Sequence, residues 1–126
     1  GYFTLHREIA ATDLDLVVFV GDYIYESSNP RYRLRPHEGD RPTNLAGYRR
    51  RHATYKLDPA LREAHAAHPW LVTWDDHEVE NDYANDASRF EERSAEALLR
   101  LRAAAYKAYF EHMPVSPAMA PDGPSM

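Results

Sequence analysis

The sequence predicts an α/β fold in which two buried parallel strands are flanked by helices. Two compact apolar segments, residues 16–20 and 70–74, have the length and the β-branched or aromatic content of strands. Helical patterns lie before, between and after these segments, an order that favours a right-handed parallel crossover. Two strands alone do not make a stable sheet, so the pattern predicts part of an α/β domain.

The amino-terminal region predicts a helix followed by a strand. Apolar residues recur at helical spacing in residues 2–12, which predicts a short helix. The run from Leu16 to Val20 is continuously apolar and ends at Gly21, a pattern typical of a strand buried on both faces. The polar residues 27–43 then predict a long loop, and a loop of this length inside a compact domain is usually functional or mobile.

The middle of the chain predicts two helices and the second strand. Thr43 is a candidate N-cap for a helix through the sequence LAGYRRRHATYK. Asp58 followed by Pro59 is a second helix start, with the aspartate as N-cap and the proline at the first helical position. This helix is expected to end before Pro69, and the sequence WLVTW, residues 70–74, predicts the second buried strand.

The last third of the chain predicts one long helix. Ser88 and Glu91 have the spacing of a capping box, which predicts a helix over roughly residues 89–112. The expected apolar stripe of this helix consists of Phe90, Ala97, Leu98, Leu101, Ala105 and Tyr109. The Pro-rich residues 115–126 predict irregular structure.

Composition argues against several classes of protein. The formal net charge is −5, so no overall positive field favours nucleic acid. No apolar run reaches the roughly 20 residues of a membrane-spanning helix, and no signal peptide is visible. The chain contains no cysteine, which leaves neither disulfides nor thiolate ligands. Most basic residues are arginine, whose planar guanidinium suits phosphate and carboxylate groups.

Acidic clusters directly follow both predicted strands. GDYIYE follows the first strand and DDHE follows the second. In parallel neighbours, Asp22 and the pair Asp75 and Asp76 would leave the same carboxyl edge of the sheet, where open α/β folds bind ligands. Oxygen ligands with one histidine, here His77, suit calcium, manganese, zinc or iron. Tyr25 lies one turn beyond the first carboxylate, and a phenolate at that position favours ferric iron.

These residues also have simpler structural interpretations. An aspartate after a glycine, such as Asp22, is typical of a turn or a helix cap, and Asp75 is a candidate cap of a helical turn. A lone histidine such as His77 is more often a structural hydrogen-bonding residue, and tyrosines in such segments are often core aromatics. The joint occurrence of two acidic motifs at two strand ends favours a metal site.

Several motifs together carry a more specific signal. GDYIYE at residues 21–26 and TWDDHEV at residues 73–79 are accompanied, in a fixed order, by LAGYR, YKLDP, HPW and AYFEHMP. The set resembles the signature segments of the PhoD-like alkaline phosphatases, which belong to the calcineurin-like metallophosphoesterases. The resemblance implies that residues 1–114 are part of a metallophosphoesterase α/β sandwich. Residues 115–126 are then an irregular tail or a truncated continuation.

This resemblance implies a metal-dependent phosphoric ester hydrolase. Members of the family hydrolyse phosphomonoesters, and often phosphodiesters, by attack of a metal-activated water on phosphorus. They use iron together with calcium in a binuclear or multinuclear site. They are typically exported by the twin-arginine route, which implies a periplasmic or extracellular location. The expected partner is therefore a phosphate monoester or diester substrate.

The resemblance also implies a role for each motif residue. Asp22 would bridge two metals, Tyr25 would be the phenolate on ferric iron, and Asp76 would bind the second metal. His77 would hydrogen-bond the phosphate or protonate the leaving oxygen. Supporting or substrate-orienting roles are expected for Asp75, Glu78, Asn81, Arg35 and His37.

The chain departs from the family pattern in two respects. The iron site of the family includes a cysteine just before the position of Gly1, and this chain contains no cysteine. The carboxyl-terminal half of the family domain, with its further strands and later Asp and His ligands, is also absent. The comparison therefore predicts an internal fragment that lacks the remainder of its own domain and has little or no activity when isolated.

Two functions of other classes stay open from the sequence. The chain could be a non-catalytic metal-binding module that holds one ion through Asp22, Tyr25 and Asp76. It could also be a structural α/β piece whose acidic residues are solvated caps. Metal binding without hydrolysis would favour the module, and unchanged function after Asp22→Asn and His77→Ala would favour the structural piece.

Overall fold

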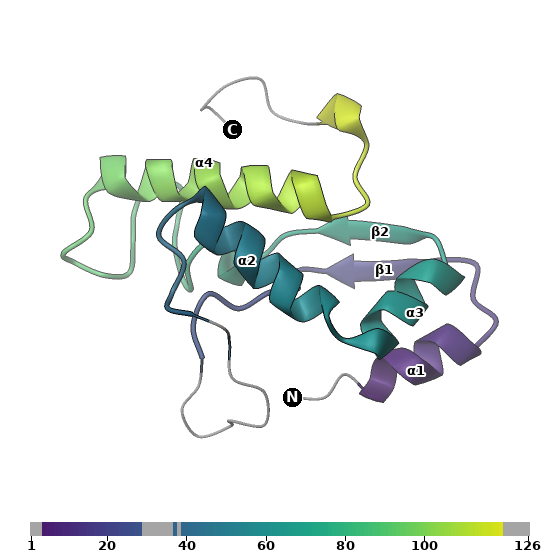
Figure 1. Ribbon diagram of the computed structural model, residues 1–126. Coiled ribbons are helices and arrows are strands. Elements are labelled where there is room, and N and C mark those ends of the chain that lie inside the picture. The colour runs from purple at the N-terminus through teal and green to yellow at the C-terminus, as the bar shows by residue number, and fades with distance from the viewer. Residues whose placement is uncertain (1–3, 29–36, 38, 120–126) are drawn as a thin grey trace.

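A computed structural model describes residues 4–28, 37 and 39–119 of the chain (Figure 1). In chain order, the elements are α1 (Thr4–Ala11), β1 (Val17–Val20), α2 (Leu45–Lys56), α3 (Pro59–Ala67), β2 (Trp70–Thr73), the 3₁₀ helix η1 (Asp76–Glu78), α4 (Ala95–His112) and the 3₁₀ helix η2 (Pro117–Met119). The order of helices and strands matches the prediction and confirms the α/β fold class.

The two strands form a parallel sheet, as predicted (Figure 1). Val17 pairs with Trp70 and Val20 pairs with Thr73, so both strands end side by side at one edge. The connection between the strands runs through α2 and α3. Helix α1 packs against α3, and α2 packs against α4. The segments that leave the two strands therefore start close together at the carboxyl edge of the sheet.

The core holds these strand ends against the helices. Ile24 after β1, Tyr48 of α2, and Leu98 and Tyr109 of α4 are fully buried. The Tyr48 hydroxyl also donates to the main-chain carbonyl oxygen of Val79 at 2.6 Å, which ties α2 to the segment after β2. Because these groups are close-packed, the position of both strand-end segments is set by the core.

The prediction that the strands are buried on both faces is wrong for the described residues. Val18 is 58% and Val20 is 74% exposed, whereas Phe19 between them packs against the core. Leu71 of β2, the register partner of Val18, is 60% exposed. Side chains of a strand alternate between the two faces of its sheet, and the described helices cover only one of them. The second face is apolar, but no described element packs on it.

The predicted start of the last helix is also wrong. Helix α4 begins at Ala95, because Ser94 is its N-cap and its side chain accepts a main-chain N–H of the first turn. Ser88 does not cap this helix; its hydroxyl donates instead to the buried Glu80. Phe90, assigned to the apolar stripe, therefore lies before the helix and not on it.

The starts of the two middle helices agree with the sequence to within one residue. Asn44, and not Thr43, caps α2, and its side chain accepts the N–H of Gly47 at 3.0 Å. Asp58 caps α3 as predicted, with Pro59 in the first turn. Most of the predicted loop at residues 27–43 lies outside the described residues. Among those described, no helix is both long and apolar enough to cross a membrane.

Candidate metal centre

The turn after β1 has a backbone conformation that favours glycine. Gly21 has a φ angle of +103° and Asp22 one of +56°, both in the left-handed region. A Cβ atom on Gly21 would lie 2.4 Å from the Cβ of Asp75 and 2.7 Å from its main-chain nitrogen. Glycine therefore allows the two strand ends to approach this closely. Strained positions such as Asp22 are frequent at functional sites.

The turn after β2 is held by a capping box. The Asp75 carboxylate accepts the main-chain N–H of Asp76 at 2.9 Å, and the Glu78 carboxylate accepts that of Asp75 at 2.7 Å. Asp75 thus caps a helical turn, in agreement with its simpler interpretation. This turn fixes the backbone that carries Asp76 and His77.

Glu78 joins the two turns. It is 1% exposed, and its carboxylate also accepts the main-chain N–H groups of Asp22 at 3.1 Å and Ile24 at 3.3 Å. Burial raises the pKa of Glu78, and the N–H groups that donate to it oppose this rise. Glu78 therefore helps to set the geometry of the site by holding the main chain of both turns.

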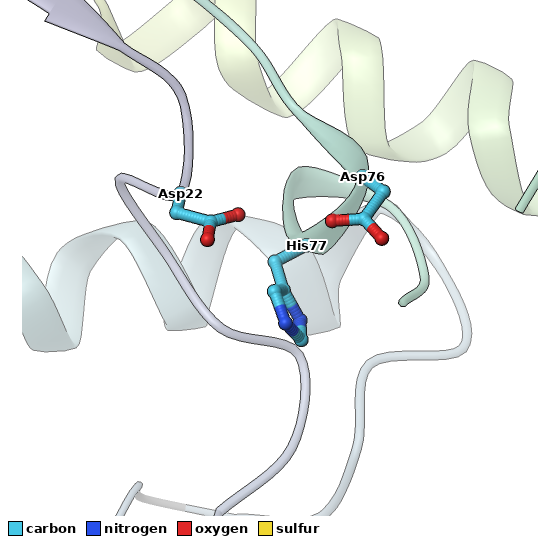
Figure 2. A group of neighbouring side chains, drawn as sticks. All are labelled: Asp22, Asp76 and His77. Atoms are coloured by element: carbon cyan, nitrogen blue, oxygen red, sulfur yellow. The ribbon is translucent and has the colours of Figure 1, made fainter. Parts of the chain in front are cut away.

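Asp22, Asp76 and His77 come together where the two strands end. One ligand atom from each residue lies within 4.8 Å of the others. Figure 2 shows the carboxyl groups of Asp22 and Asp76 turned toward each other, with the His77 imidazole beside them. The expected convergence of the two strand-end motifs is confirmed. Oδ1 of Asp22 is buried without a hydrogen-bond partner among the described residues, an arrangement that is costly unless a cation or water compensates it.

Tyr25 lies directly beside this cluster. Its hydroxyl donates to Oδ2 of Asp22 at 2.9 Å, and its ring centroid lies 4.2 Å from that of His77. Burial, together with the hydrogen bond to Asp22, raises the pKa of Tyr25 to about 12. A cation at the cluster would act in the opposite direction and favour the phenolate.

His77 is held by a buried carboxylate from the other strand end. Its Nδ1 lies 2.7 Å from Oε2 of Glu26, which is 2% exposed. Burial lowers the pKa of His77, but the bond to Glu26 and the carboxylates of Asp22 and Asp76 outweigh it, so the pKa is raised. The sequence did not single out Glu26, although its place in the same GDYIYE block as Asp22 is a signal that could have identified it.

Asn81 lies at the border of the site. Its main-chain N–H donates to Oε1 of Glu26 at 3.4 Å, and its side-chain amide donates to Asp82 at 2.6 Å. The main-chain N–H of Asp82 bonds in turn to Oδ2 of Asp76. Asn81 therefore contacts residues that hold the cluster, and its amide is directed to a neighbouring carboxylate.

His37, one of the two loop residues expected near substrate, has its described contacts with residues outside the cluster. His37 contacts the Tyr55 hydroxyl at 3.0 Å through Nε2 and Arg51 through Nδ1. Burial, together with the positive charge of Arg51, lowers the pKa of His37 to about 4. The Tyr55 hydroxyl also accepts the main-chain N–H of Tyr25 at 3.1 Å, so His37 is linked to the cluster only through other residues. Arg35 lies outside the described residues.

The donor set fits a hard or borderline cation. Two carboxylates and an imidazole lie within reach of one ion, with a phenol bonded to one of the carboxylates. The unpartnered buried oxygen of Asp22 is the observation that favours a cation over a purely hydrogen-bonded cluster.

A parallel sheet whose strands end in a carboxylate and imidazole cluster defines an α/β protein with a candidate cation centre. The chain belongs to the PhoD-like phosphatase family, whose model matches residues 1–125. The resemblance drawn from the motifs is thereby confirmed.

Two relatives show what share of their own length this chain covers. It is 48% identical over 131 residues to alkaline phosphatase D of Bacillus subtilis (strain 168), a match that covers 100% of this chain and 22% of that protein. The solved structure of PhoD superposes with a TM-score of 0.93 at 48% identity, covering 100% of this chain and 25% of that one. The chain therefore spans about a quarter of the length of the relatives it matches.

Proposed function

We propose that this chain contributes metal ligands and a catalytic histidine to a metal-dependent phosphoric ester hydrolase that acts on phosphate monoesters or diesters. The convergence of Asp22, Asp76 and His77 at the ends of two parallel strands carries the proposal. Membership of the PhoD-like phosphatase family supports the reaction class.

Asp22, Tyr25 and Asp76 are the residues we propose as metal ligands, with iron and calcium as the cations. Two carboxylates and a phenol offer the oxygen donors that such cations prefer. Bound cations would supply Lewis acidity toward the phosphate oxygens and a water of lowered pKa. Glu78 and Asp75 would keep the ligands in place through the hydrogen bonds that define the two turns.

His77 would act directly on the substrate. Its raised pKa favours the imidazolium, which can hydrogen-bond a phosphate oxygen or give a proton to the leaving oxygen. Asn81, Arg35 and His37 are proposed to orient the substrate or its surroundings. Because the pKa of His37 is lowered, His37 would act in this role as a neutral imidazole.

We further propose that the complete gene product is exported and works in the periplasm or outside the cell. The family resemblance supports this location. The test is to express the gene in its host and assay culture supernatant and periplasm for the protein by immunoblot.

The decisive experiment compares two aspartate variants of the complete gene product. Asp22→Asn keeps the size of the side chain but removes its charge, so bound metal and phosphatase activity are both expected to fall by at least about 100-fold. Asp13→Asn is the matched control, because Asp13 is exposed and lies before β1. Metal content is measured by elemental analysis, and activity with a phosphate monoester and a phosphate diester.

The same experiment separates the alternatives. Metal that is lost with Asp22→Asn, in a wild-type protein that hydrolyses neither ester, would support the non-catalytic metal-binding module. Unchanged metal and activity in Asp22→Asn would support the structural piece. The isolated chain is expected to show little or no turnover. Robust hydrolysis by a purified, contaminant-free preparation of residues 1–126 would contradict that expectation.

A further inference from the structure

Glu26 is a buried carboxylate whose two oxygens have separate partners. Oε1 lies 3.1 Å from Nη2 of Arg41 and accepts the main-chain N–H of Asn81 at 3.4 Å. Oε2 lies 2.7 Å from Nδ1 of His77. Because Oε1 is already occupied by two donors, Oε2 is the oxygen directed at the imidazole.

The arginine that holds Glu26 is itself fixed from the other side. Arg41 lies 3.6 Å from the fully buried Glu80, and Glu80 forms an ion pair with Arg93 at 2.8 Å. The Arg41 guanidinium also lies 4.6 Å from the centroid of the Phe90 ring. A row of alternating charges, Arg93, Glu80, Arg41 and Glu26, therefore holds this carboxylate and restricts its rotation.

This arrangement restricts the orientation of the His77 ring. Its Nδ1 faces Glu26, its face lies against Tyr25, and none of the described residues hydrogen-bonds to Nε2. A carboxylate cannot donate a hydrogen bond, so the proton of this contact must lie on Nδ1. In the neutral imidazole, Nε2 is then the nitrogen with a free lone pair, as in other sites where a carboxylate fixes a functional histidine.

We propose that Glu26 is a positioning residue for His77: it holds the imidazole in one orientation and one tautomer, with the proton on Nδ1 and the lone pair of the neutral ring on Nε2. The kinetic consequence of this proposal rests on the proposed function, because it requires that the protein hydrolyses a phosphate ester. The position of the proton on His77 can be measured whether or not the protein is active.

A merely structural role for Glu26 would have different consequences. Glu26 also contacts Arg41 and Asn81, so its loss could loosen the fold near the site without acting through His77. Such loosening would reduce activity whether or not the imidazole is present. An effect that passes through His77 must disappear when His77 is replaced.

The kinetic test is therefore a double-mutant cycle in the complete gene product, with Glu26→Gln, His77→Ala and the double variant. A glutamine has one acceptor oxygen, so it cannot serve both Arg41 and His77. Glu26→Gln is expected to lower kcat by about 10- to 100-fold with little change in KM. In the His77→Ala background, Glu26→Gln is expected to cause no further loss. Equal losses in both backgrounds, or unchanged kcat in the single variant, would overturn the proposal.

The spectroscopic test uses the histidine nitrogens of the 15N-labelled wild-type protein at alkaline pH, with His77→Ala to identify the signal. The Nδ1–H tautomer is expected for His77, and Glu26→Gln is expected to shift the population toward Nε2–H. An Nε2–H tautomer in the wild type would overturn the proposal even if Glu26→Gln fails to fold. Glu111→Gln, which changes a glutamate on α4 paired with Arg49, should leave both readouts unchanged.

The two tests keep this inference apart from the proposed function. If the metal-loaded wild type hydrolyses no phosphate ester, the proposed function fails, and the tautomer measurement still decides the role of Glu26. If the wild type is active and His77→Ala is impaired, but the cycle shows equal losses, only the positioning role of Glu26 fails.

Discussion

Glu78 lies 56 positions after Asp22 in the chain, yet its Oε2 accepts the main-chain N–H of Asp22 at 3.1 Å. The same oxygen accepts the N–H of Asp75 at 2.7 Å, so one buried carboxylate joins the two turns that carry the candidate ligands. The geometry of the cluster thus depends on a residue whose bonds go to the backbone.

Glu78→Gln is therefore expected to destabilise the strand ends. A glutamine replaces one carboxylate oxygen by an NH₂ group, which would face main-chain N–H donors and leave them unpaired. A buried donor without a partner costs about 1–3 kcal/mol, so the free energy of unfolding should fall by at least that amount. Urea unfolding of the complete gene product, followed by tryptophan fluorescence, measures the change. Glu63→Gln on the exposed side of α3 is the control, and equal midpoints for both variants would contradict the prediction.

Gly21→Ala is expected to be far more harmful than Gly39→Ala, although both glycines have positive φ angles. An alanine at position 21 would collide with the backbone and Cβ of Asp75. At position 39, the nearest atom is the end of the Arg50 side chain at 3.2 Å, which can move. The second change should cost about 1–2 kcal/mol for the left-handed backbone alone. Thermal unfolding and metal content of the two variants test this ranking, and similar melting temperatures would refute it.

The sequence predicted the parallel strands because both apolar runs have strand length and are separated by helical patterns. It could not predict the exposed face. Val18 and Phe19 are both apolar, so the alternation of period two that separates an outer face from an inner one is invisible in this strand. Only the structure shows that Val18 faces away from the described core and Phe19 faces into it.

The start of α4 was predicted wrongly because of a contact between side chains that the local pattern does not contain. Ser88 and Glu91 have capping-box spacing, but the Ser88 hydroxyl is bonded to Glu80, a buried residue of the preceding segment. A hydrogen bond to a buried residue eight positions earlier has thus taken the group that the local pattern assigned to a cap. Ser94 then supplies the N-cap, although no glutamate or glutamine follows it at the spacing of a capping box.

The convergence of Asp22 with Asp76 was predictable, because each follows its strand directly and parallel neighbours share a carboxyl edge. The pairing of Glu26 with His77 was not, because it depends on the direction of two side chains in the turns beyond the strands, which the register of the sheet does not determine. Motif residues near strand ends can be placed from sequence, whereas the partners that orient them depend on side-chain geometry.

Tyr25→Phe tests the proposed iron ligand by colour. A phenolate bound to ferric iron gives a visible charge-transfer absorption, and a phenyl ring cannot. The iron-loaded complete gene product is expected to be coloured, and the variant to lose that band. Tyr83→Phe is a matched control, since the Tyr83 hydroxyl bonds to Tyr106 at 2.7 Å and not to the cluster. A wild-type protein that binds iron without a visible band, or a variant that keeps the band, would exclude the phenolate.

His52 is expected to make the folded state sensitive to acid. It is fully buried in the core, and neither ring nitrogen has a hydrogen-bond partner among the described residues. Burial, together with the nearby His112 and Lys56, lowers the pKa of His52 from 6.5 to about 3. Between these two values the unfolded chain binds a proton that the folded chain excludes. Stability is therefore lost as the pH falls through this window, and the contribution of His52 is constant above it.

His52→Phe removes this proton and retains an aromatic ring in the core. As the pH falls from 6.5 to 3, the free energy of unfolding should decrease less steeply in the variant than in the wild type. The difference between the two slopes should correspond to the uptake of up to one proton per molecule on unfolding. His37 and His65, whose pKa values are each lowered to about 4 mainly by burial, act in the same direction and stay in both proteins, so they cancel in the comparison. Urea unfolding across this pH range measures the two slopes. Identical slopes would mean that His52 takes up a proton in the folded core, and they would contradict the prediction that its imidazole stays neutral there.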